Sequence, residues 1–122
     1  MLTFDMMRDK GILLVTPAEP LEKADFEKLS ETIDPFIAQN GTLSGLMILV
    51  KSFPGWENFS ALMAHFKFVA DHQRNIKRVA AVTDSDIAKI LPRIAEHFIH
   101  HEVRQFRYGG KDRAPAWLQN GH

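Results

Sequence analysis

Three histidines near the end of the chain have a spacing that metal sites use. His100 and His101 follow His97 by three and four residues, so on a continuous helix the three would share a face. Neutral imidazoles at such spacing bind zinc. However, His101–Glu102 is not followed by a second histidine at the step that zinc motifs require. Cationic histidines also suit the end of a helix, so we expect no metal site and no cofactor.

The residue types that enzymes use as nucleophiles and bases form no known set in this chain. The sequence contains no cysteine, which excludes thiolate catalysis, zinc–thiolate sites and disulfides. It also lacks Gly-x-Ser-x-Gly, a Walker loop and a dinucleotide-binding fingerprint. These absences predict a non-catalytic protein. The alternative is an enzyme of unknown reaction that uses Asp84, Tyr108 and nearby histidines at the carboxyl ends of parallel strands.

Aromatic side chains are concentrated in one short stretch. Residues 53–68 hold five of them, namely Phe53, Trp56, Phe59, Phe66 and Phe68. Apolar binding pockets favour aromatic walls. Phe59 and Phe66 fall on one helical stripe and are expected in the core. Phe53, Trp56 and Phe68 fall outside that stripe and are expected to border a binding surface, together with Tyr108. The alternative is core packing with a tryptophan that anchors a loop.

Composition predicts one globular domain over residues 1–122. The chain is 45% hydrophobic and 25% charged, which is ordinary for a folded domain. Its 15 basic and 15 acidic side chains cancel, so nothing favours a nucleic-acid partner. No apolar run approaches the roughly 18 residues of a membrane span, and the first residues lack a secretory pattern. We therefore expect a cytoplasmic protein with no stable membrane insertion.

The first forty residues predict a hairpin followed by a helix. Apolar residues alternate over residues 2–6, and residues 12–16 are a continuous apolar run after a turn at Asp9–Gly11. From Leu21 to Gln39 the apolar residues recur at three- and four-residue steps, as on a helix. Pro35 is expected to kink this helix or to end its regular part.

The rest of the chain predicts strands that alternate with helices. Gly45–Lys51 and Val79–Thr83 are unbroken apolar runs, typical of adjacent parallel strands buried on both faces. A helix over Asn58–Asn75 is expected between them, with His65 and His72 on its exposed side. A third helix should bury Ile90 and Ile94, before an edge strand at Val103–Tyr108 and a short last helix. The order β-β-α-β-α-β-α-β-α predicts an α/β fold with a mostly parallel five-stranded sheet flanked by helices.

This order of elements resembles the STAS domains, which are the SpoIIAA-like anti-sigma-factor antagonists, and the related fold of SEC14-type lipid carriers. The stretches that carry the resemblance are Leu46–Val50 with the loop Phe53–Trp56, Arg78–Asp84, and Glu102–Phe106 followed by Ala116–Leu118. The resemblance implies a SpoIIAA-like (STAS/SEC14-type) binding module. Such a module would dock on a regulatory protein partner, self-associate as a homodimer, or hold a small apolar, lipid-like ligand near the second helix.

The resemblance also implies a phosphorylation switch. In STAS antagonists, a partner kinase modifies a serine at the start of the helix after the central strand. The nearest equivalents here are Ser52 and Ser60, and neither has the Asp-x-Ser-type context of those regulators. A phosphate would add about 1.5–2 negative charges beside helix N-terminal amides and so alter docking. The alternative is that both hydroxyls are capping or solvated groups.

Overall fold

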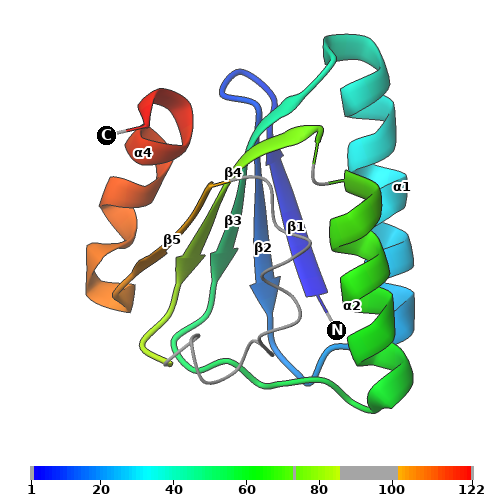
Figure 1. The fold of residues 1–122 in the computed structure, drawn as a ribbon. Helices are drawn as coiled ribbons and strands as arrows, with labels where there is room; N and C mark the ends of the chain where they lie inside the picture. Colours follow the sequence, from blue (N-terminus) through cyan, green and yellow to red (C-terminus); the bar gives the residue numbers. More distant parts are fainter. Residues whose placement is uncertain (1, 73, 86–101, 122) are drawn as a thin grey trace.

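Five strands form one sheet in chain order, β1 to β5, in the computed structural model of this protein (Figure 1). The structure describes residues 2–72, 74–85 and 102–121. The strands are β1 (Leu2–Met7), β2 (Ile12–Pro17), β3 (Leu43–Leu49), β4 (Ile76–Val82) and β5 (Glu102–Phe106). β1 and β2 pair antiparallel, and all other neighbours pair parallel. The predicted hairpin, the predicted mostly parallel sheet and the edge position of β5 are therefore confirmed.

The turn between β1 and β2 depends on a glycine. Gly11 has a φ of 67°, a left-handed conformation that glycine adopts without steric cost. The amides of Lys10 and Gly11 both donate to the carbonyl of Met7, at 3.1 and 2.9 Å. This closed turn fixes the register in which Met7 faces Ile12.

The two central strands are adjacent and parallel, as their apolar runs predict. Leu46 of β3 lies opposite Val79 of β4 in the register. Side chains alternate across the sheet, so Leu46 joins the core on one face while Met47 joins the core on the other. Both faces of the sheet are thus covered, which explains why these strands carry so few polar residues.

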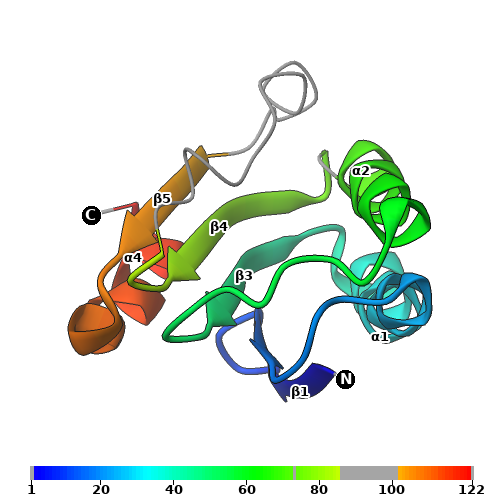
Figure 2. The ribbon, with the colours of Figure 1, turned by 90° about the horizontal axis from the view of Figure 1, so that it is seen from below.

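Helices lie on both faces of the sheet (Figure 2). α1 (Lys23–Asn40) and α2 (Phe59–His72) cover one face, and the short 3₁₀ helix η2 (Tyr108–Arg113) leads into α4 (Ala114–Asn120) on the other. α4 approaches β3 closely, because a Cβ added at Gly45 would lie 2.7 Å from Cδ2 of Leu118. Glycine at this position is what allows the helix to reach the sheet.

One prediction about α1 is corrected by the structure. The helix does not end at Pro35 but continues to Asn40. Pro35 is exposed, so its ring faces solvent, and the cost is one lost hydrogen bond to the carbonyl four residues earlier. The buried stripe of α1 keeps its contacts with the core on both sides of the proline, through Phe26, Leu29 and Ile33 before it and Phe36 after it.

The third predicted helix, with Ile90 and Ile94, lies outside the described residues. The prediction that these two side chains are buried therefore stays a prediction.

Candidate functional site

α2 buries the opposite side from the one that the sequence predicts. Its buried residues are Ala61, Phe68 and His72. The prediction that Phe59 and Phe66 lie in the core is wrong for Phe59, which is 73% exposed, and Phe66 is only half-buried. The physical reason is that α2 carries apolar residues on two opposite sides, so periodicity alone cannot select the side that faces the sheet.

The outward side of α2 carries a second apolar stripe. It consists of Phe59, Met63, Phe66 and Ala70, and we call it the outer stripe. Met63 is 46% exposed, and with Phe59 it is one of the two large hydrophobic residues that the described part of the chain leaves exposed. This surface was not predicted from the sequence, because the periodicity of α2 placed the same residues in the core.

Phe68 lies inside the domain rather than at its surface. It is 6% exposed, and its ring lies 6.2 Å from the ring of Phe26 on α1. The phase argument that removed Phe68 from the predicted stripe was correct, but the side chain covers the neighbouring helix. Phe68 therefore holds α2 against α1, and its predicted role in binding remains untested.

The loop between β3 and α2 is fastened to the start of α1. Leu21 forms an isolated parallel bridge with Trp56. The Leu21 amide donates to the carbonyl of Gly55 at 2.8 Å, and the Glu57 amide donates to the carbonyl of Leu21 at 2.8 Å. These bonds hold Trp56 beside the start of α1, where its side chain reaches His65 of α2.

Trp56 belongs to a row of aromatic rings in contact that runs from the loop to α1 and α2. Its ring lies 5.3 Å from Phe53 and 5.8 Å from His65, and His65 stacks on Phe26 at 5.0 Å. Trp56 Nε1 donates to Nδ1 of His65 at 3.1 Å, so the ring proton of a neutral His65 sits on Nε2. Burial lowers the pKa of His65 to about 4, and the imidazole is neutral at pH 7. The prediction that His65 is a surface residue is wrong, because the tryptophan supplies the partner that its buried nitrogen needs.

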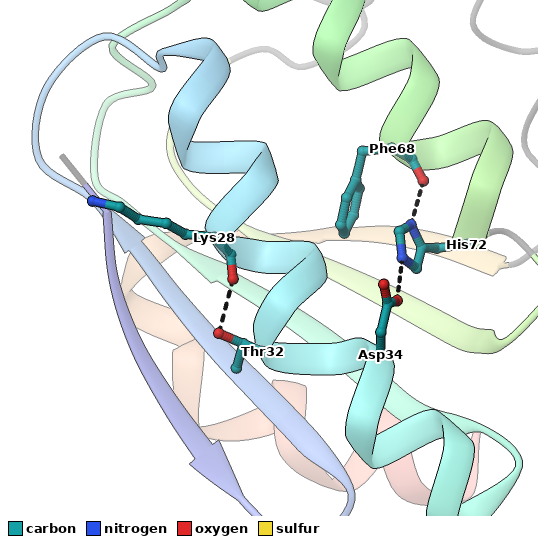
Figure 3. Close-up of polar contacts among 5 residues, drawn as sticks. All are labelled: Lys28, Thr32, Asp34, Phe68 and His72. Carbon is teal, nitrogen blue, oxygen red and sulfur yellow. Dashed lines mark hydrogen bonds and ion pairs between the residues drawn. The ribbon is translucent and has the colours of Figure 1, made fainter.

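His72 links the two helices at the other end of this row. It is buried, and Nδ1 lies 2.8 Å from the carbonyl of Phe68 while Nε2 lies 2.7 Å from Oδ1 of Asp34 (Figure 3). Since a carbonyl can only accept, Nδ1 donates in the first contact. The prediction that His72 lies at the surface is wrong. Both of its ring nitrogens have polar partners, the carbonyl of Phe68 and Oδ1 of Asp34, and these contacts make its burial tolerable.

The carboxyl ends of β4 and β5 border a shallow depression of about 320 Å³. Its described lining residues are Thr83, Asp84, Ser85, Gln105 and Arg107. The polar groups there bond to the backbone: Oδ1 of Asp84 accepts from the Tyr108 amide at 3.0 Å, and Oγ of Ser85 accepts from the Phe53 amide at 2.9 Å. Thr83 Oγ1 donates to the carbonyl of Lys51 at 3.2 Å. These bonds tie the loops together and cap the start of η2.

The structure brings some of the predicted binding residues together and not others. Phe53 and Trp56 are in ring contact. Within the described part of the chain, the Tyr108 amide donates to Asp84 and the Phe53 amide donates to the adjacent Ser85. The ring of Tyr108 lies under Nζ of Lys111 at 5.3 Å. Phe68 is separated from the loop by the rings of the α1–α2 row. The structure therefore brings Phe53 and Trp56 together and places Phe68 apart from them, between α1 and α2, and their role in binding stays a prediction.

The two candidate phosphorylation serines are both exposed. Ser60 lies in the first turn of α2, beside Phe59 of the outer stripe. The side chain that caps α2 is Asn58, whose Oδ1 accepts from the Ala61 amide at 2.9 Å. Of the two alternatives for Ser60, the capping role is therefore taken by Asn58, and a solvated hydroxyl agrees with its exposure. Ser52 lies in the loop after β3.

Metal and membrane features can be assessed only within the described ranges. Among residues 2–72, 74–85 and 102–121, no cluster of three histidine or carboxylate side chains is placed to hold a metal ion. His97, His100 and His101, which have the metal-like spacing, lie outside these ranges. No helix in the described part of the chain has the length and apolar character needed to cross a membrane.

A mostly parallel sheet that begins with a hairpin and carries helices on both faces defines an α/β domain. A family model described as SpoIIAA-like matches residues 12–119. The chain therefore belongs to the SpoIIAA-like family, which is a family of binding modules. The resemblance inferred from the sequence is confirmed.

One solved structure shows the same fold over nearly the whole chain. It is an uncharacterised protein from the DUF3478 family with a SpoIIAA-like fold, from Shewanella loihica PV-4. The two are 21% identical, the match covers 97% of this chain and 92% of that one, and the TM-score is 0.69. None of the curated proteins compared with the chain matches it. At this identity the likeness concerns the fold alone.

Proposed function

We propose that this domain is a non-catalytic, cytoplasmic module that docks on a protein partner through the outer stripe of α2. The observation that carries the proposal is the exposure of Phe59 and Met63 on one side of a helix whose other side is already buried. Contiguous exposed apolar side chains mark interaction surfaces, because isolated proteins gain nothing by leaving them in water. Large anchors of this kind supply much of the energy of an interface.

The packing between α1 and α2 supports docking over enclosure of a small apolar ligand. A ligand near the second helix needs a cavity lined by free aromatic walls. Instead, the rings of Phe26, His65 and Phe68 pack against one another, and Nε1 of Trp56 is occupied by His65. Among the residues that the structure describes, the large apolar side chains left exposed are Phe59 and Met63, on the outward side of α2.

The hydrogen bonds at the carboxyl ends of the strands support a binding role over catalysis. Asp84 and Ser85, which an enzyme would need to present to a substrate, accept hydrogen bonds from backbone amides. Their positions are explained by loop anchoring. Regulation by phosphorylation would act on the proposed surface directly, since a phosphate on Ser60 would place about two negative charges beside Phe59.

Site-specific photo-crosslinking in cells tests the proposal. A benzophenone amino acid replaces Phe59 in one variant and the exposed Ala116 of α4 in a control. We expect a discrete protein adduct from position 59 and none from position 116. The proposal is overturned if position 59 gives no adduct, or if both positions give the same adducts. A co-purified apolar molecule in native mass spectrometry, without an adduct at 59, would establish the ligand-holding alternative instead.

A further inference from the structure

Two histidines on the inner side of α2 contact other elements of the domain in opposite ways. His65 meets Trp56 from the loop after β3, and His72 meets Asp34 from α1. They are seven residues apart in the sequence, which is about two turns of a helix, so both rings lie on the same side of α2. Their partners differ, because the indole of Trp56 is a hydrogen-bond donor whereas the groups around His72 are acceptors.

Both ring nitrogens of His72 face groups that can only accept a hydrogen bond. Nδ1 lies 2.8 Å from the backbone carbonyl of Phe68, and Nε2 lies 2.7 Å from Oδ1 of Asp34 (Figure 3). The Asp34 side chain is 59% exposed, and an exposed carboxylic acid is ionised at neutral pH. A neutral imidazole has one N–H and satisfies only one of these two acceptors, whereas an imidazolium donates to both.

We propose that His72 is an imidazolium in the folded domain and that its second proton holds α2 against α1. The ring donates through Nδ1 to the last turn of α2 and through Nε2 to α1, so one side chain ties the two helices together. The contact is therefore a pH-sensitive clamp, which forms when the second proton is bound and breaks when that proton leaves. The clamp belongs to the isolated chain and does not depend on the proposed docking surface.

Two further features of the structure favour a positive charge at this position. The ring of His72 stacks on the ring of Phe68, with centroids 4.4 Å apart, and the face of an aromatic ring attracts a cation. His72 is also the last residue of α2, where the helix dipole favours a cation. Burial opposes the charge, since His72 is only 6% exposed. The carboxylate of Asp34, the carbonyl, the ring and the helix end together offset that cost.

The charged groups beside the ring along the chain do not change this balance. Asp71 and Arg74 flank His72, carry opposite charges and are both exposed, so water and salt screen them. The strand side chains that pack beneath α1 and α2 belong to the hydrophobic core. Within the described residues, Asp34 is the charged side chain that contacts the imidazole.

The pH effect of His72 has the opposite sign to that of His65. In the unfolded chain a histidine releases its second proton at about pH 6.5. Above that pH the folded chain binds a proton at His72 that the unfolded chain does not, so raising the pH lowers the stability. His65 must instead be neutral to accept from Trp56, so acid breaks that contact. The packing of α2 is thus weakened on both sides of neutral pH.

Nitrogen-15 NMR of the imidazole rings tests the protonation state directly. At about pH 7.5, where an ordinary histidine is mostly neutral, we expect one ring with protons on both nitrogens. In the variant Asp34→Asn the same ring should show one bare nitrogen, because the amide N–H can donate to Nε2. The proposal is overturned if no ring is doubly protonated at this pH, or if Asp34→Asn leaves the doubly protonated ring unchanged.

Urea unfolding of the full chain at about pH 6 and about pH 9 measures what the second proton contributes. We expect the unfolding equilibrium constant of the wild type to rise at least about fivefold more between these pH values than that of Asp34→Asn. Asp71→Asn removes an exposed carboxylate beside His72 and is the charge-matched control, which should follow the wild type. Equal changes in the wild type and Asp34→Asn overturn the proposal. An Asp71→Asn chain that behaves like Asp34→Asn also overturns it, since the effect would then come from net charge alone.

Discussion

Acidification should destabilise this domain through His65. Burial lowers the pKa of this imidazole from 6.5 to about 4, whereas in the unfolded chain the pKa returns to its ordinary value near 6.5. Between these two pH values the unfolded chain binds a proton that the folded chain does not. The contribution of His65 to stability is therefore complete above about pH 6.5 and is lost as the pH falls toward 4.

The size of the loss follows from the same two pKa values. Each pKa unit of difference is worth about 1.4 kcal/mol, so the difference between 6.5 and about 4 sets an upper limit of about 3.5 kcal/mol. His65 is only half-buried by exposed area, so solvent screens part of this energy, and we expect about 1–2 kcal/mol by pH 4.5. The proton would also disturb the row of rings, because a doubly protonated imidazole can no longer accept from Nε1 of Trp56.

Urea unfolding of the wild type and of His65→Gln at pH 7 and pH 4.5 measures this loss. The glutamine amide oxygen can still accept a hydrogen bond from the Trp56 indole, but the side chain does not titrate. The variant therefore shows how pH changes the stability through every titrating group except His65. We expect the wild type to lose about 1–2 kcal/mol more than the variant, together with a change in tryptophan fluorescence. Parallel losses in the two proteins, within about 0.3 kcal/mol, would refute the reasoning.

Three further predictions concern stability at neutral pH and low protein concentration. Phe68→Ala should lower the free energy of unfolding by about 3–5 kcal/mol, because it empties a buried ring position. Phe59→Ala should change it by less than about 0.5 kcal/mol, and equal losses in denaturant melts would mean that α2 is wrongly oriented. Gly45→Ala should lower the free energy of unfolding by about 1–3 kcal/mol, since the new methyl group overlaps Leu118. A variant as stable as the wild type would show that α4 does not lie against β3 at this position. Trp56→Phe should cost about 1 kcal/mol through its lost hydrogen bond to the neighbouring imidazole, and an unchanged melting temperature would contradict that bond.

The sheet could be predicted from the sequence because its signals are local. The apolar runs that became β3 and β4 are too long and too uniform to be exposed on either face, and a parallel pair is the arrangement that buries both. The hairpin turn at Gly11 is equally local, since only a few residues around a positive-φ glycine decide it.

The orientation of α2 could not be predicted because it depends on distant partners. Apolar residues occupy two opposite sides of the helix, and histidines count as polar in any periodicity argument. The side that faces the domain is the one where His72 meets Asp34, 38 residues away in the sequence, and where His65 receives the bond from Trp56. No feature of the sequence around α2 predicts either contact. The periodicity therefore assigned the side with Phe59 and Phe66 to the core.

The candidate surface was predicted only in part for the same reason. The loop with Phe53 and Trp56 was placed correctly at the carboxyl end of a central strand, because parallel sheets present their loops there. Its attachment to Leu21 through two backbone hydrogen bonds is a tertiary contact without a sequence signal. Because of this attachment, Trp56 helps to hold the loop against α1 and α2. The large apolar side chains left exposed in the described residues lie instead on the outer stripe of α2.

Hydroxyl-radical footprinting tests most directly whether the outer stripe is the surface that binding covers. Phe59 and Met63 are exposed and reactive toward oxidation, and the half-buried Tyr108 serves as an internal reference. The account predicts that labelling of Phe59 and Met63, relative to Tyr108, falls several-fold between dilute purified protein and protein inside cells. Labelling of the stripe that stays the same under both conditions would contradict it.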